Sequence, residues 1–189
     1  MEAIFSWLAI NFDLPVLDWI QEELSNPWMD VIMPAITALG NAGIFWIVLA
    51  VILLLIPKYR RTGLAMSAAL LMGLVVCNLV MKPSFARIRP YDYQLEHFGR
   101  EIALLIPAEH DFSFPSGHTI ASFEAATALT VYHKKWGIAA MILASLIAFS
   151  RLYLYVHYPT DVICAVVLGI GLGILGCVLI NKLSQRKKI

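Results

Sequence analysis

The sequence predicts an all-α integral membrane protein, a helical bundle with five transmembrane helices. Of its 189 residues, 60% are hydrophobic and only 14% are charged, whereas a soluble domain is nearer half apolar and a quarter charged. The hydrophobic residues fall into five runs, most of them close to the roughly 20 residues that cross a bilayer core. A chain of this length forms one compact bundle rather than two domains.

The first element, residues 1–30, mixes aromatic and aliphatic side chains with acidic ones such as Asp13 and Asp18. It is too acidic for a comfortable transmembrane span and too apolar for a free tail. We therefore expect an amphipathic helix that lies in the membrane interface, with its tryptophans at the level of the lipid headgroups. A sixth, tilted span over Ala3–Ile20 is the alternative.

A membrane domain is predicted over residues 31–182, and a basic cytoplasmic tail at 183–189 follows it. The first hydrophobic run contains Gly40–Gly43, which either breaks the helix or lets another helix approach closely. Residues 83–117 are the one long polar stretch, and we expect an extracytoplasmic loop there without regular secondary structure. One run, Thr119–Tyr132, is short and needs a neighbouring turn to complete its span. The predicted spans are Val31–Ile56, Gly63–Met81, Thr119–Tyr132, Trp136–Leu154 and Asp161–Ile180.

Positively charged side chains indicate which end of the bundle faces the cytoplasm. They fall on the loops or tail at one membrane face, and the positive-inside rule makes that face cytoplasmic. The alternation of spans then brings residues 82–118 and 151–161 together at the opposite, extracytoplasmic face. The compact bundle favours a bacterial cytoplasmic membrane. The basic residues in question are Lys58, Arg60, Arg61, Lys134, Lys135, Lys182, Arg186, Lys187 and Lys188.

One of the charged segments at that face contains Ser150-Arg151, His157 and Asp161. Asp161 follows Pro159-Thr160, a typical helix start with Thr160 as the expected N-cap. A carboxylate in the first turn of a helix stays ionised and can accept a hydrogen bond from one nitrogen of His157. The other ring nitrogen then keeps its lone pair and can act as a nucleophile or base. The alternative is a histidine–aspartate pair that only caps the helix.

Two further segments supply groups suited to binding a phosphate. In Pro115-Ser116-Gly117-His118, a serine hydroxyl and backbone amides at a helix start can bind an anion, with His118 placed as a general acid. Lys82 and Arg89-Pro90 add a point charge and a planar fork of donors. The alternatives are an ordinary loop-to-helix turn and a lysine that reaches the membrane interface.

Two other polar side chains are assigned to supporting roles. We expect Arg87 to contact headgroups or a loop. Glu124 lies in an apolar run, where a carboxyl must be neutral or paired, and we expect a structural hydrogen bond for it.

Together these segments resemble the three-part signature of the type 2 phosphatidic acid phosphatase family, in the same order over residues 82–161. The resemblance implies that His157 attacks phosphorus to form a phosphohistidine and that Asp161 orients it. It implies that His118 protonates the leaving group and then activates water. It implies no metal and no cofactor, in agreement with the lack of a metal-ligand spacing among the three cysteines. The implied phosphate contacts are Lys82, Arg89, Ser116, Gly117, His118 and Arg151.

The predicted function is metal-independent hydrolysis of a phosphorylated lipid in the membrane. The candidate substrates are undecaprenyl diphosphate, phosphatidylglycerophosphate and phosphatidic acid, with a preference for a polyprenyl diphosphate. One alternative is phosphotransfer from the same intermediate to another acceptor, and another is a non-catalytic membrane protein that binds anions or lipids. No basic tract is interleaved with aromatic residues, which excludes nucleic acid as a partner.

Overall fold

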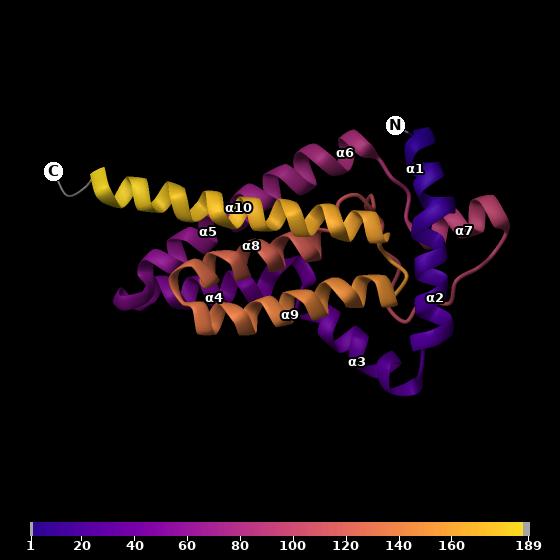
Figure 1. The fold of residues 1–189 in the computed structure, drawn as a ribbon, viewed down its shortest axis with the longest axis horizontal. Coiled ribbons are helices and arrows are strands. Elements are labelled where there is room, and N and C mark those ends of the chain that lie inside the picture. Colours follow the sequence, from indigo (N-terminus) through magenta and orange to yellow (C-terminus); the bar gives the residue numbers. More distant parts are fainter. Residues whose placement is uncertain (1, 187–189) are drawn as a thin grey trace.

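The structure, a computed structural model, describes residues 2–186, and its regular secondary structure over this range is entirely helical. An N-terminal helical run is followed by a broken helix, a long third run, and three helices joined by short connections (Figure 1). The elements are α1 (Glu2–Leu8), η1 (Ala9–Asp13), α2 (Leu14–Leu24), α3 (Pro27–Ala38), η2 (Asn41–Gly43), α4 (Ile44–Leu55), η3 (Pro57–Tyr59), α5 (Arg60–Leu74), η4 (Val75–Met81), α6 (Lys82–Phe85), α7 (Pro90–Phe98), α8 (Gly117–Tyr132), α9 (Lys134–Tyr153) and α10 (Pro159–Arg186).

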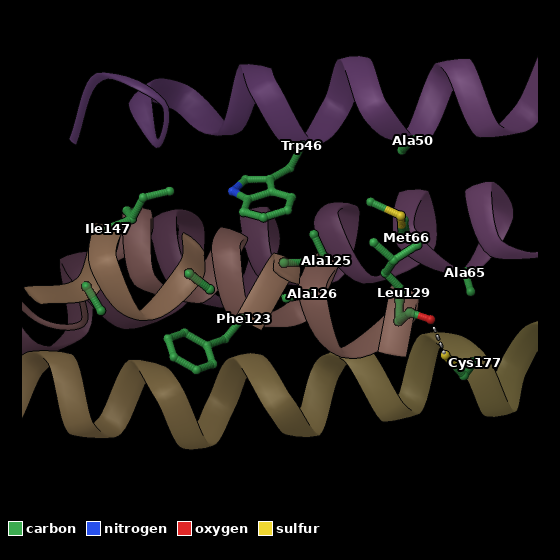
Figure 2. Packing of buried hydrophobic residues seen from close by; sticks show 14 of the residues in the cluster. Trp46, Ala50, Ala65, Met66, Phe123, Ala125, Ala126, Leu129, Ile147 and Cys177 are labelled. Carbon is green, nitrogen blue, oxygen red and sulfur yellow. Dashed lines mark hydrogen bonds between the residues drawn. The ribbon is translucent and has the colours of Figure 1, made fainter. Parts of the chain in front are cut away.

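Helix α8 lies at the centre of the bundle and packs against α5, α9 and α10. Glycines let α10 approach α8 very closely, since a Cβ atom added at Gly173 would lie 2.6 Å from the backbone oxygen of Glu124. Small residues at helix crossings are typical of membrane bundles because lipid offers no hydrophobic drive between helices. Figure 2 shows Phe123 of α8 between α4, which carries Trp46, and α10, which carries Cys177. Close packing on several sides thus fixes the position of α8 and of Gly117 and His118 at its start.

Within the described residues, four helical runs are long and apolar enough to cross a membrane, and there are five if the bent pair α3–α4 is one span. The predicted spans 31–56, 63–81, 136–154 and 161–180 each fall on one of these runs. The fifth predicted span corresponds to α8, which begins at Gly117 and has 16 residues. The chain is therefore a multi-pass membrane protein, as predicted.

The first predicted span, 31–56, is broken at Gly40–Gly43. These residues both interrupt the helix and allow a close approach by another helix, the two alternatives that the sequence left open. Helix α3 begins at Pro27, where Asn26 Oδ1 accepts hydrogen bonds from two backbone amides, a standard N-cap. It is separated from α4 by a bend of 40°. Gly40 at this break packs against the His118 ring, because a Cβ atom there would lie 2.7 Å from His118 Cδ2. The break thus makes room for a residue of the predicted site.

The N-terminal run α1–η1–α2 lies across the end of the bundle rather than along it (Figure 1). It buries Leu14, Leu17 and Ile20 in a cluster with residues at the end of α9. It exposes apolar side chains such as Trp7 and Trp19. Its length and hydropathy would suffice for a span, but its direction favours the predicted interfacial helix over the sixth span.

The prediction that residues 83–117 lack regular secondary structure was wrong for part of the segment. Helix α7 starts at Pro90 with extended backbone at Arg89, and it ends at Gly99 in a left-handed conformation. Both are common helix boundary signals. Tyr91 and Tyr93 of α7 are buried in the same cluster as the N-terminal helix. The helix therefore anchors one end of the segment, and residues 99–116 return to α8 without a further helix.

Candidate active site

The three charged segments meet at the end of the bundle that the N-terminal helix covers. A cavity of about 540 Å³ opens there, and its polar lining comes from the start of α6, the segment between α7 and α8, the start of α8 and the turn between α9 and α10. Residues from all three predicted motifs therefore share one cavity, as span counting predicted. The ionisable and imidazole side chains that line the cavity are Lys82, Glu109, Asp111, His118, Glu124 and His157.

The predicted contact between His157 and Asp161 is present. His157 Nδ1 lies 3.4 Å from Asp161 Oδ2, and both side chains are buried. The same carboxylate oxygen accepts hydrogen bonds from the Ser113 hydroxyl and from the Tyr158 backbone N–H, which lies 3.0 Å away. A carboxylate held by several donors is fixed in orientation, and it fixes the imidazole that it contacts.

His157 is held in its neutral form. Burial lowers its pKa well below the ordinary value of a histidine, and the positive charges of Arg89 and Arg151 act in the same direction. Its Nε2 atom faces the cationic side of the site, 3.4 Å from Arg89 Nη1. A neutral imidazole whose one nitrogen is directed to a carboxylate keeps a lone pair available on the other.

The three predicted phosphate-binding cations are already paired with carboxylates of the 99–116 segment. Glu109 bridges Arg151 and Arg89, with 2.6 Å between its Oε2 atom and Arg89 Nη2. Asp111 bridges Lys82 and Arg89 in the same way. Two carboxylates therefore connect all three cations beside His157, although the sequence analysis gave neither a role.

Both carboxylates are ionised at neutral pH. Burial alone would raise the pKa of Glu109, but the charges of Arg151 and Arg89 outweigh it and lower the pKa to about 2. Burial likewise opposes ionisation of Asp111, and the hydrogen bond and charge of Lys82 together with Arg89 lower its pKa to about 2. The cation cluster thus holds two negative charges in the free protein.

Residues of the second motif occupy the start of α8. Ser116 is fully buried, and its hydroxyl accepts a hydrogen bond from Thr119 within the same helix start. Gly117 lines the cavity without a close neighbour, since an added Cβ atom would only reach ordinary contact distance. His118 also lines the cavity, with its Nε2 atom 3.0 Å from Asn41 Oδ1 at the break between α3 and α4. Asn41 was not among the predicted site residues.

The expectations for Arg87 and Thr160 were wrong. Arg87 is not a headgroup contact: its side chain is 3% exposed, and it donates to Asp161 Oδ1 at 2.6 Å and to Asp13 Oδ2 at 2.7 Å. Thr160 is not the N-cap of α10, which begins at Pro159; its backbone N–H donates to Asp13 Oδ1 at 2.9 Å. The contact between Asp13 and Arg87 was not predicted. The signal in the sequence was an acidic side chain among apolar residues, because such a group needs a partner.

Glu124 has no structural hydrogen bond for its Oε2 atom within the described residues, contrary to the expectation. The carboxyl group lies deep in α8 and faces Gly73, where a Cβ atom would come within 2.2 Å of Oε2. It lines the inner end of the same cavity, whose walls there are apolar. The cavity therefore runs from the charged site into the hydrophobic part of the bundle.

The family model described as "PAP2 superfamily" matches residues 62–185, which include all three motifs. The chain belongs to the PAP2 superfamily. The predicted family resemblance is thereby confirmed.

Other PAP2 proteins extend the likeness beyond the motifs. An undecaprenyl-diphosphatase of Sulfolobus acidocaldarius is 32% identical over 145 residues, which cover 76% of this chain and 67% of that protein. The crystal structure of LpxE from Aquifex aeolicus has a TM-score of 0.72 at 26% identity and covers 87% of this chain and 93% of that one. The transmembrane PAP2 phosphatidylglycerolphosphate phosphatase of Bacillus subtilis has a TM-score of 0.70 at 29% identity, with 96% and 88% covered. This PAP2 protein is a membrane-embedded lipid phosphatase.

Proposed function

We propose that this phosphatase removes phosphate from a lipid phosphomonoester or diphosphate with His157 as its nucleophile, and that no metal takes part. The observation that carries the proposal is the pair of carboxylates beside His157. The carboxylate oxygens of Glu109 and Asp111 form ion pairs with Lys82, Arg89 and Arg151. A phosphate group is also negatively charged and also offers oxygen atoms as acceptors, so it can take the place of these carboxylates.

Binding of the substrate begins with that exchange. The phosphate oxygens replace the carboxylates, and the two arginines offer planar forks of donors while Lys82 offers a point charge. Amides at the start of α8, at Ser116 and Gly117, add donors at a helix N-terminus. Because these donors are in position before the reaction, they stabilise the charge that spreads over the equatorial oxygens in the transition state.

The first chemical step forms a bond between phosphorus and His157 Nε2 and breaks the bond from phosphorus to the leaving oxygen. The imidazole is neutral at the start, and it gains positive charge as the bond forms. Asp161, 3.4 Å from Nδ1, stabilises that charge. His118 gives its proton to the leaving oxygen, then takes a proton from the water that hydrolyses the phosphohistidine.

The shape of the cavity supports a lipid substrate. Its deeper walls include Ile47 and Val51 of α4 and Leu71 and Leu74 of α5, and these four side chains also reach the outer surface of the bundle. A hydrocarbon tail can therefore stay in the membrane while its headgroup reaches the cations. Among the candidate lipids we favour a polyprenyl diphosphate, because the Sulfolobus relative is named an undecaprenyl-diphosphatase. Phosphatidylglycerophosphate and phosphatidic acid are the competing substrates.

The side of the membrane is also a proposal. Basic residues such as Lys58, Arg60, Lys134 and Lys182 lie on the connections and helix ends away from the cavity. The positive-inside rule then orients the cavity to the extracytoplasmic face of a bacterial cytoplasmic membrane. Phosphate release by intact cells from substrate added outside, without uptake, tests this orientation.

The main test is phosphate release in detergent from a panel of phospholipids and polyprenyl diphosphates. We expect His157→Ala to lower turnover at least about 1000-fold, because the covalent route is lost, while the protein still inserts and stays monodisperse. Vanadate should inhibit and EDTA should not. Retained turnover in His157→Ala, or strict dependence on an added metal, would contradict the mechanism.

A further inference from the structure

We propose that Asp13, from the N-terminal helix, is a positioning residue for the reaction and acts through Arg87 on Asp161. The inference rests on the proposed role of His157 as nucleophile. It extends the site to a segment that lies outside all three motifs and before the first residue of the PAP2 match.

The contacts form a continuous chain of charged groups. Asp13 Oδ2 accepts from Arg87 Nη2 at 2.7 Å, and Arg87 Nη1 donates to Asp161 Oδ1 at 2.6 Å. The other oxygen of Asp161 lies 3.4 Å from His157 Nδ1. All four side chains are almost completely buried. Since water cannot take the place of any partner, each group in the chain depends on the next.

Thr160 locks Asp13 and Arg87 together. Its hydroxyl donates to Asp13 Oδ2 at 2.8 Å and accepts from Arg87 Nη1 at the same distance. Its backbone N–H donates to Asp13 Oδ1 at 2.9 Å. Asp13 therefore caps the start of α10 from another segment, next to the residue that contacts the histidine. Negative charge at this end of a helix is also favoured by the helix dipole.

Aromatic rings fix the plane of the guanidinium group. Arg87 Cζ lies 3.7 Å from the centroid of the Tyr158 ring and 4.6 Å from that of Phe5. Tyr158 is next to His157 in the chain, and Phe5 belongs to α1. The N-terminal helix thus contributes both a carboxylate and an aromatic ring to Arg87, whose position cannot shift without moving both.

The charge balance explains why Asp13 matters for the reaction. Two carboxylates and one guanidinium give this side of His157 a net charge of −1. The opposite side presents Lys82, Arg89 and Arg151 together with the carboxylates Glu109 and Asp111. When the imidazole becomes positive, the net negative charge behind it lowers the energy of the transition state. Without Asp13, the full charge of Arg87 would fall on Asp161 and weaken its interaction with His157.

The test compares two substitutions in the same N-terminal helical run, Asp13 at the end of η1 and Asp18 in α2. Asp13→Asn keeps the volume and an oxygen for the Thr160 N–H, but it removes the negative charge. We expect kcat for phosphate release to fall about 10- to 100-fold, with KM within about twofold, as for other groups that orient a catalytic residue. The matched control is Asp18→Asn. Asp18 contacts Tyr155 and the half-exposed Arg100, and it does not contact Arg87 or Asp161. The kcat of Asp18→Asn should therefore stay within about twofold of the parent value.

A double variant tests the route through Arg87. If Asp13 acts on Asp161 only through this arginine, Asp13→Asn should cost nothing further in an Arg87→Met background. Thr160→Val provides a second variant that leaves every charge in place if either of these fails to insert. We expect it to lower kcat about three- to tenfold at constant KM, because the hydroxyl that joins Asp13 and Arg87 is lost.

Equal kcat values for Asp13→Asn and Asp18→Asn would overturn the inference, as would a loss that multiplies with that of Arg87→Met. An unchanged kcat in Thr160→Val would do the same. Failure of the proposed function gives a different result, since the parent protein would then release no phosphate or His157→Ala would remain active. An active parent, an inactive His157→Ala and an unaffected Asp13→Asn would reject the positioning role alone.

Discussion

Arg87 and Arg89 are two residues apart and both buried, yet their partners differ in one decisive respect. Arg87 binds Asp13 and Asp161, whose side chains are 0% exposed. Arg89 binds Glu109 and Asp111, whose side chains are 25% and 57% exposed. Partners that are sealed inside the bundle are permanent, whereas partners on an accessible segment can be exchanged for a ligand. The same residue type thus forms permanent buried ion pairs at one position, and at the other we propose that it exchanges its partners for the substrate phosphate.

The largest expected effect is on stability, which should depend on Arg87 much more than on Arg89. Arg87→Met leaves two buried carboxylates without a counter-charge, and the free energy of unfolding should fall by about 3–5 kcal/mol. Arg89→Met leaves carboxylates that reach water, and it should cost no more than about 1 kcal/mol. Thermal unfolding in detergent measures the difference. Similar losses in both variants would show that exposure of the partners does not distinguish the clusters.

A smaller effect tests whether the exposed carboxylates are exchangeable. Asp111→Asn removes the carboxylate that pairs with both Lys82 and Arg89 and, in the proposed exchange, competes with the substrate phosphate for them. We expect KM to fall about two- to tenfold with kcat unchanged, since the cations no longer have to release a carboxylate. The rise in melting temperature on adding vanadate should also increase, because a ligand that binds more tightly stabilises the folded state more. An increase in KM would mean that Asp111 assists binding.

The smallest effect is the dependence of stability on pH. His157 and the carboxylates Glu109 and Asp111 should lower the stability in different pH ranges. The pKa of His157 is lowered in the fold, so below about pH 6.5 the unfolded chain takes up a proton that the folded one does not, and stability falls as the pH falls. The lowered pKa values of Glu109 and Asp111 act later, from about pH 4 down to about 2.

Melting temperatures measured from pH 8 to pH 3 check this order of events. His157→Gln should flatten the curve just below pH 6.5, and Asp111→Asn should flatten it only below about pH 4. A curve in which Asp111→Asn alters the upper region would contradict the assignment of the two ranges.

The sequence was sufficient to predict the bundle and the convergence of the motifs, because hydrophobic length and positive charge determine how a chain crosses a membrane. It also indicated the His157–Asp161 contact, since both residues flank one helix start. Local patterns cannot show which distant segments meet. Asp13 and Arg87 are 74 residues apart, and neither belongs to a motif. Glu109 and Asp111 were visible as charges in a polar stretch, but only the fold brings them to Lys82, Arg89 and Arg151.

The N-terminal helix across the end of the bundle has a consequence for how the family is delimited. The PAP2 match begins at residue 62, and every signature residue lies between 82 and 161. Nevertheless, the side chain that caps α10 next to His157 is Asp13. A shortened protein designed from the family boundaries would keep the complete signature and lose this cap. For this chain, the segment that the family model matches is shorter than the segment that we propose the reaction needs.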